Sequence, residues 1–171
     1  MKKSLVFRSI CMALVVLMTA FAFAACGGGE GGGEGGGNNV KGETGSWGKY
    51  TEILVPEGMT LKGGNILDEN DPTIVKLNDT DNEFHWILFN IYDEDTCKSS
   101  IASTKEVNNG EDVTIEINGT TWTGVSYKSL SADGFQMYGQ VDGQYVLAGG
   151  FYYAYDSAVV QAVIASLHVT E

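Results

Sequence analysis

Arginine is nearly absent from this chain of 171 residues. Arg8 is the only one, and the part after Ala25 holds seven Lys against 22 Asp and Glu, a net charge near −15. A surface of that sign repels phosphate backbones, and without arginine it lacks the side chain that most often reads guanine. We therefore expect no nucleic-acid partner.

Cysteine and histidine are also scarce, with three and two copies. Cys97 is the only cysteine well inside the chain, which excludes an internal disulfide framework and a cysteine zinc site. No Gly-x-Ser-x-Gly motif accompanies the histidines, so a triad of nucleophile, histidine and acid has no support. We interpret His85 as a satisfied strand-end residue, His168 as a residue favoured by a helix carboxyl-end dipole, and Cys97 as a small buried hydrophobe.

The N-terminus combines a basic start, Met1-Lys2-Lys3, with an uncharged apolar run from Ile10 to Ala25. This pattern predicts a secretory signal peptide over residues 1–25. The segment Phe23-Ala24-Ala25-Cys26 resembles the lipobox of bacterial lipoproteins, with Phe23 in place of the usual leucine. The resemblance implies that Cys26 becomes the mature N-terminus and carries a diacylglycerol thioether. Ordinary cleavage after Ala25 is one alternative, and an uncleaved helix is another, although the run is short of the ~20 residues that span a bilayer.

A glycine tract follows Cys26, and nine of the eleven residues 27–37 are glycine. Such a segment buries no apolar area and loses much entropy on ordering, so it predicts a flexible tether over residues 26–46. The composition of residues 47–171 is that of a single globular domain. Together these segments predict a protein held by its lipid on the extracytoplasmic face of the cell membrane.

Two hairpins are visible in the second half of the domain. Residues 113–117 alternate between apolar and polar, and Asn118-Gly119 is the best two-residue hairpin turn. Pairing across it puts Trp122 opposite Ile115, on the apolar face. Asp142-Gly143 joins a second pair of strands in the same way, and both faces of the resulting sheet carry apolar side chains. Each face therefore needs a cover.

Two predicted helices can supply the covers. One runs over residues 96–107, and the other is capped by Asp156 or Ser157 and has apolar residues at helical spacing up to Leu167. The apolar run 84–92 predicts a strand buried on both faces. We therefore expect an α+β fold, a mainly antiparallel sheet flanked by two helices, with further strands at 47–55, 73–77 and 168–170.

Three segments carry a resemblance to a known family. They are the turn Val55-Pro56-Glu57-Gly58-Met59, the hairpin Ile117-Asn118-Gly119 and the closing run Ile164-Ala165-Ser166-Leu167-His168-Val169. In this arrangement the domain resembles the α/β/α sandwich of PsbP-like domains over the whole of residues 47–171. The resemblance implies a group with many bacterial lipoproteins that have no catalytic activity, and it supplies no site residue besides the lipidated Cys26.

Two acidic segments, 68–71 and 79–83, alternate oxygen ligands of the kind that Ca²⁺ prefers. An EF-hand is excluded, because Phe84 stands at the sixth position of the second segment and Asn90 at the twelfth. A looser calcium site between the two loops stays open beside the ordinary reading, solvated acidic turns. We expect no cofactor and no dedicated metal site.

Carboxylates and aromatic rings are the remaining candidates. A glycoside hydrolase could draw its acid pair from Asp93, Glu94, Asp95 or Glu116, but their spacing selects no pair. The aromatic residues could form a stacking platform for sugars or peptide, with Tyr152 and Tyr155 exposed at a sheet end, although such residues are more often core. That set comprises Tyr138, Tyr145, Phe151, Tyr152, Tyr153 and Tyr155.

These observations favour a non-catalytic binding module of the cell envelope. Its partner would be an envelope protein, a glycan or a small solute, and it would contact the membrane through the lipid on Cys26. The alternative is an envelope hydrolase that uses carboxylates, with or without calcium. A passive spacer is a third reading.

Overall fold

The structure is a computed structural model that describes residues 40–65 and 67–170. The predicted signal peptide and Cys26 lie outside the described residues. The described residues form five strands, a helix, four strands, a second helix and a short last strand, which is the predicted order. These elements are β1 (Gly42–Trp47), β2 (Tyr50–Pro56), β3 (Met59–Gly63), β4 (Ile74–Asp79), β5 (Trp86–Tyr92), α2 (Glu94–Asn108), β6 (Glu111–Ile117), β7 (Thr120–Ser129), β8 (Ala132–Val141), β9 (Gln144–Phe151), α3 (Ala158–Ala165) and β10 (His168–Val169).

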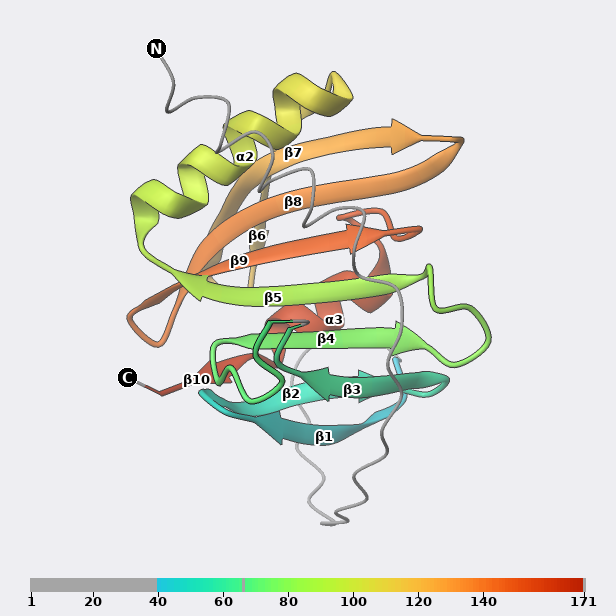
Figure 1. The fold of residues 1–171 in the computed structure, drawn as a ribbon, viewed down its shortest axis with the longest axis vertical. Helices are drawn as coiled ribbons and strands as arrows, with labels where there is room; N and C mark the ends of the chain where they lie inside the picture. Colours follow the sequence, from blue (N-terminus) through green and yellow to red (C-terminus); the bar gives the residue numbers. More distant parts are fainter. Residues whose placement is uncertain (1–39, 66, 171) are drawn as a thin grey trace. The chain divides into compact units, whose positions relative to one another are not determined.

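The strands form two antiparallel sheets (Figure 1). The larger has seven strands in the order β3-β4-β5-β9-β8-β7-β6, and the smaller has three in the order β1-β2-β10. With two helices packed against them, this is the predicted class, an α+β fold with a mainly antiparallel sheet flanked by two helices.

Both predicted hairpins have the expected register. Ile115 pairs with Trp122 across the turn at Asn118-Gly119, and Met137 pairs with Ala148 across the second turn. Asn118 and Asp142 lie in the left-handed region at φ 51° and 47°, and the glycine after each has φ 75° or 86°. These are the angles of a type I′ turn, whose twist matches that of paired strands.

The two helices cover opposite faces of the seven-stranded sheet (Figure 1). Phe135 and Met137 of β8 point into a core shared with Val160 and Val163 of α3. Side chains alternate along a strand, so Gln136 points to the other face. There it accepts hydrogen bonds from the Ser100 and Thr104 hydroxyls of α2, at 3.2 and 2.8 Å. Helix α2 packs on β7, β8 and β9 and leaves β3, β4 and β5 outside its cover.

The folded part begins earlier than predicted. Strand β1 contains residues 42–46, which we assigned to the tether, and it pairs with β2. A Cβ on Gly42 would lie 2.3 Å from the Val55 carbonyl oxygen, and one on Gly45 would lie 3.0 Å from the side chains of Val55 and Leu61. These glycines therefore permit close packing of strands, whereas their composition alone is typical of a tether.

Helix boundaries differ slightly from the prediction. Helix α2 begins two residues before Thr96, because Asp93 caps it. It ends one residue after Val107, and Asn109 follows as the C-cap in the left-handed conformation. The Asp93 carboxylate accepts the Thr96 N–H at 2.8 Å and the Thr96 hydroxyl at 2.7 Å. Of the two caps considered for the last helix, Ser157 is the one used.

Candidate functional site

Several loops meet at one end of the seven-stranded sheet. Trp86, the first residue of β5, pairs with Asn78 near the end of β4 and with Phe151 at the end of β9. Phe151 also pairs with Gly134 near the start of β8. The register therefore brings the β4–β5 loop, the β7–β8 turn and the segment after β9 to the same end of the sheet.

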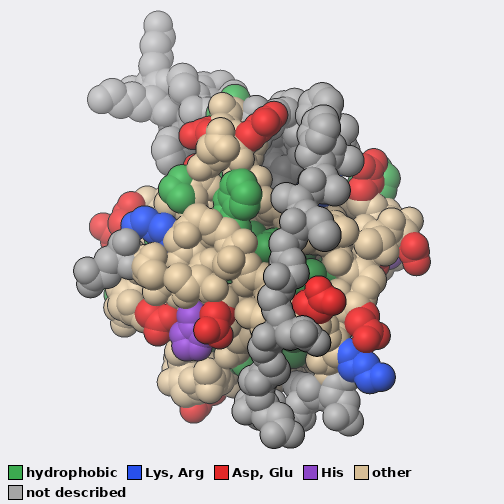
Figure 2. Space-filling model, turned by 90° about the horizontal axis from the view of Figure 1, so that it is seen from below, with side chains coloured by type: hydrophobic (Ala, Val, Ile, Leu, Met, Phe, Trp, Pro, Cys, Tyr) green, Lys and Arg blue, Asp and Glu red, His purple; other side chains and the backbone are tan. Residues whose placement is uncertain are grey.

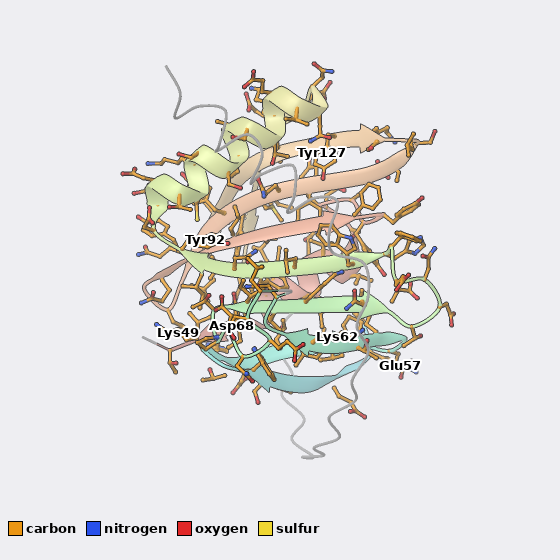
Figure 3. All side chains as sticks on the ribbon, in the orientation of Figure 1. Lys49, Glu57, Lys62, Asp68, Tyr92 and Tyr127 are labelled. Atoms are coloured by element: carbon orange, nitrogen blue, oxygen red, sulfur yellow. The ribbon has the colours of Figure 1, made fainter. Side chains whose placement is uncertain are left out.

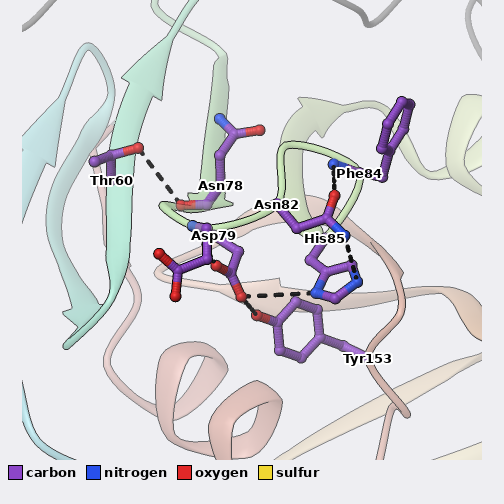
Figure 4. A network of polar contacts seen from close by, with 8 residues as sticks. Thr60, Asn78, Asp79, Asn82, Phe84, His85 and Tyr153 are labelled. Carbon is purple, nitrogen blue, oxygen red and sulfur yellow. Dashed lines mark hydrogen bonds and ion pairs between the residues drawn. The ribbon is translucent and has the colours of Figure 1, made fainter.

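A polar network occupies the β4–β5 loop (Figure 4). One carboxylate oxygen of Asp79 accepts the Asp81 N–H at 2.8 Å. The other accepts the Tyr153 hydroxyl at 3.4 Å and lies 3.7 Å from Nδ1 of His85. The second ring nitrogen of His85 is 3.2 Å from the side-chain nitrogen of Asn82. The backbone N–H of Asp81 is the main reason that the pKa of Asp79 is lowered, so Asp79 is a stable carboxylate that orients the imidazole.

The ring of His85 contacts the ring of Tyr152. Their ring centroids are 4.2 Å apart with an interplanar angle of 32°, and Phe151 meets Tyr152 edge-on at 4.9 Å. Tyr152 has φ +67°, an outlier for a bulky residue, and the residue is 47% exposed. Its N–H donates to the Asp133 carbonyl at 2.7 Å. A conformation of this kind costs about 1–3 kcal/mol, and here it holds an exposed aromatic ring in one orientation.

A hollow of about 480 Å³ lies beside this segment: Asp133, whose carbonyl accepts the Tyr152 N–H, lines it, whereas Tyr152 and His85 are not among its lining residues. Five segments line it: the end of α2, the adjoining ends of β6, β7 and β8, and residues 154–156. Lys128 pairs with Asp133 at 3.0 Å, which leaves two carboxylates in excess, so the lining disfavours anionic ligands. Its charged and phenolic residues are Glu111, Tyr127, Lys128, Asp133, Tyr155 and Asp156.

The two acidic segments do not share a site. Strand β4 separates them, and its six residues extend about 17 Å. Figure 3 labels Asp68 toward one end of the sheet and Glu57 toward the other, where Gly58 accepts the N–H of Thr80 at 2.8 Å. The carboxylate of Asp68 accepts the Asn70 N–H at 2.9 Å. A calcium site between the loops is therefore wrong, and no group of three or more metal-ligating side chains occurs among residues 40–65 and 67–170.

The predicted carboxylate candidates have structural partners or are exposed. Asp93 caps α2, and hydrogen bonds from Thr96 lower its pKa. Glu94 is 2.7 Å from the Lys98 ammonium, whose hydrogen bond lowers the pKa of Glu94. Asp95 and Glu116 are exposed on α2 and β6. A general acid needs a raised pKa, and neither Asp93 nor Glu94 has one.

Cys97 is fully buried under α2, as expected of a small hydrophobe. Burial, with Asp93 and Glu94 nearby, raises the pKa of its thiol to about 11. His168 has a different partner from the predicted one: its Nδ1 is 3.1 Å from an Asp142 carboxylate oxygen, at the β8–β9 turn. Asp142 also accepts the Val169 N–H at 3.0 Å, so it ties β10 to that turn.

The predicted aromatic platform divides into two clusters. Tyr138 and Tyr145 have ring centroids 6.3 Å apart and lie near Glu94, away from the β4–β5 loop. Phe151, Tyr152 and Tyr153 lie at the loop end, where Tyr152 is exposed as predicted. Sequence reasoning did not select Asp79 or Trp86 for this site, because only the register brings them beside β9.

Charge elsewhere matches the composition. On the face seen in Figure 2, acidic side chains outnumber lysines and lie apart from one another. None of the helices in the described part of the chain is long and apolar enough to cross a membrane.

Comparison with known proteins gives a likeness in fold. No family model matches the chain, and no curated protein matches it. The structure is similar to the solution structure of cyanobacterial PsbP (CyanoP) from Synechocystis sp. PCC 6803, with a TM-score of 0.48 and 13% sequence identity. The match covers 83% of this chain and 98% of that chain. That protein is of the group that the sequence resembles, and the likeness concerns the fold alone.

Proposed function

We propose that this chain is a lipid-anchored protein of the cell envelope whose folded domain binds a ligand without changing it chemically. The observation that carries the binding role is the exposed ring of Tyr152. The fold accepts φ +67° at this residue, its ring centroid is 4.2 Å from that of His85, and its N–H donates to Asp133, which lines a hollow of about 480 Å³. Backbone strain at an exposed aromatic residue is a common feature of ligand sites.

The lining of the hollow suggests which ligands fit. Carboxylates, amides and phenolic hydroxyls offer hydrogen bonds to a polar molecule, and the aromatic rings offer flat faces for stacking. A neutral glycan or a polar segment of an envelope protein suits this chemistry better than an anion does. The lowered pKa values of Asp93 and Glu94 favour this reading over carboxylate hydrolysis.

The anchor is supported by residues 1–37 of the sequence: a basic start, an apolar run, Cys26 and a glycine tract. Intact mass of the membrane-extracted protein, beside a Cys26→Ala variant, tests it. We expect the mass of residues 26–171 plus a diacylglycerol or triacyl increment, which the variant loses. An unmodified 26–171 chain in the medium would instead mean a secreted protein.

The binding role is tested with Tyr152→Gly. Glycine adopts φ +67° without strain, so this variant should melt at or above the wild-type temperature. Soluble glycans and envelope-derived peptides are screened by thermal shift, where a ligand of the folded state raises the melting temperature. We expect at least one such ligand to lose its effect in Tyr152→Gly and to keep it in Tyr145→Phe, at the other aromatic cluster.

Recovery of the ligand separates binding from hydrolysis. A binding module returns the ligand with its mass unchanged after long incubation. A product mass that disappears in Asp79→Asn would support a hydrolase instead, and ligands that act equally on wild type and Tyr152→Gly would contradict the Tyr152 site.

A further inference from the structure

Two lysines lie side by side on the part of the sheet that α2 does not cover. Lys62 of β3 and Lys76 of β4 are directly opposite in the antiparallel register, and both side chains are half-buried (Figure 3 labels Lys62). Like charges directly opposite on neighbouring strands destabilise a sheet. The fold therefore maintains an unfavourable pair in its larger sheet.

Carboxylates form short ion pairs with lysines elsewhere in the described residues, but none is within ion-pair distance of these two. Lys98, Lys105 and Lys128 each pair with a carboxylate, at 2.7, 2.5 and 3.0 Å. Within the described residues, neither Lys62 nor Lys76 forms an ion pair, although the chain has 22 Asp and Glu. Glu83 acts on Lys76 only from beyond ion-pair distance, so these two neighbouring lysines are positioned to share an anion from solution.

An aromatic ring completes the arrangement. The Lys76 ammonium lies over the Trp86 ring, 5.3 Å from its centroid, and Trp86 is itself half-exposed. Gly149 of β9 lies beside this ring: a Cβ at Gly149 would be 3.9 Å from Trp86, an ordinary van der Waals contact. Asn78 points to the same face, between Thr60 and Trp86 in the register. Charge, an amide and a flat apolar surface are thus available within three adjacent strands.

We propose that Lys62, Lys76 and Trp86 form a binding site for a small phosphorylated solute, whose phosphate contacts both ammonium groups and whose remainder lies against the Trp86 ring. A dianion matches two positive charges, and lysine binds phosphate as a point charge. Burial and the Lys62 charge lower the pKa of Lys76 to about 8, and both penalties fall when an anion arrives. This site shares no side chain with the Tyr152 site, so the proposal does not depend on the proposed function.

Half-burial of the lysines favours a small solute over a membrane surface. A lipid bilayer is flat and contacts the tips of protruding side chains, whereas both lysines are half-buried and the Lys76 ammonium lies over the Trp86 ring. A lipid headgroup offers the same phosphate chemistry, so the test includes it as a separate arm.

The full-length chain, in non-ionic detergent, is titrated with inorganic phosphate at constant ionic strength, and tryptophan fluorescence is followed. Trp122 is 1% exposed, whereas Trp47 and Trp86 are both half-buried. Because the Lys76 ammonium lies over the Trp86 ring, we expect a saturable change that comes from Trp86 and vanishes in Trp86→Phe. Lys62→Met and Lys76→Met should each weaken binding about tenfold or more, because each removes a charge-assisted contact. Lys49→Met, at a lysine outside the seven-stranded sheet, is the matched control and should bind as wild type does.

Three results would overturn the proposal. Chloride could produce the same change as phosphate, the lysine variants could bind as tightly as wild type, or the phosphate response could fail to saturate. A fourth measurement separates the lipid source: the Cys26→Ala chain is mixed with vesicles of phosphatidylcholine and phosphatidylglycerol. If the chain binds these vesicles only when Lys76 is present, and inorganic phosphate gives no saturable response, the ligand is a lipid headgroup and not a small solute. Melting curves of the lysine variants confirm that lost binding is not lost folding.

Discussion

Methionine at position 76 would keep most of the length and the apolar stem of the lysine and remove its charge. In the native state that charge lies in the sheet opposite Lys62, and the pKa of Lys76 falls from 10.5 to about 8. The main cause is burial and the second is Lys62. The variant thus measures the free energy of unfolding that the protein loses by holding a charged lysine at position 76.

The magnitude follows from the pKa. A fall from 10.5 to about 8 corresponds to about 3 kcal/mol between the charged and neutral forms. Lys76 is only half-buried, so solvent screening reduces this figure, and the contact with Trp86 returns about 0.5–1 kcal/mol to the charged form. We therefore expect Lys76→Met to raise the free energy of unfolding at neutral pH by about 1–2 kcal/mol. For a domain of this size that is a rise of about 4–8 °C in melting temperature.

The pH dependence has a definite sign. Between the folded pKa near 8 and the unfolded value of 10.5, the unfolded chain binds more protons at Lys76 than the folded one does. The wild type therefore gains stability from this residue as the pH rises through that window, and the advantage of the variant shrinks. Cys97 and several tyrosines have raised pKa values and act in the opposite direction, but they are common to both proteins and cancel in the difference.

Chemical denaturation of wild type and Lys76→Met at about pH 7, 8.5 and 10 measures that difference. Lys49→Met is the control at a second lysine outside the seven-stranded sheet, and its stability should stay within about 0.5 kcal/mol of wild type. Equal stability of wild type and Lys76→Met at pH 7, or a gap that widens toward pH 10, would refute the reasoning. Either result would mean that the Lys76 charge is well solvated in the native state.

Three further predictions concern packing and links between elements. Gly150→Ala should lower the free energy of unfolding by about 1–3 kcal/mol, because its Cβ would lie 2.2 Å from the ring of Phe135. Gly149→Ala is the control and should be tolerated, since no atom would be nearer than 3.6 Å to its Cβ. Equal losses of stability in thermal denaturation would contradict this. Asp142→Ala should speed hydrogen exchange at the Val169 N–H and cost about 0.5–1.5 kcal/mol, and unchanged exchange would show that the contact is dispensable. Cys97 should resist alkylation at about pH 8 until the protein unfolds, since its thiol is buried and its pKa is raised to about 11. Peptide mapping measures the labelling, and rapid labelling in the native state would contradict the burial of Cys97.

Local sequence signals predicted much of the fold. The turns at Asn118-Gly119 and Asp142-Gly143 combine residues that accept positive φ with alternating strands on both sides, so turn and register agreed. The central apolar run was assigned correctly because a strand buried on both faces is almost continuously apolar, and in β5 only Asn90 interrupts it. Where several local preferences point to one structure, sequence reasoning succeeds.

Contacts between distant segments defeated the same reasoning. Gly42 and Gly45 look like tether residues, yet they let β1 lie close to β2, whose sequence begins several residues later. Asp142 and His168 are 26 residues apart, and no motif signals their contact. The candidate calcium site failed for the same reason, because spacing in sequence cannot tell that β4 separates the two acidic loops.

The unusual features of the fold concentrate around Trp86. Its ring lies beneath the ammonium of Lys76, which is opposite a second lysine, and it pairs with Phe151, the residue before the strained Tyr152. Each feature lowers stability, and each is local: a methionine at 76 or a glycine at 152 would remove it without disturbing the core. Proteins retain such costs where a ligand uses the side chains concerned. Because one cost concerns charge and the other backbone geometry, they are independent. Lys76 on β4 and Tyr152 after β9 lie on either side of β5, which carries Trp86, and this is the strongest reason to search for ligands there.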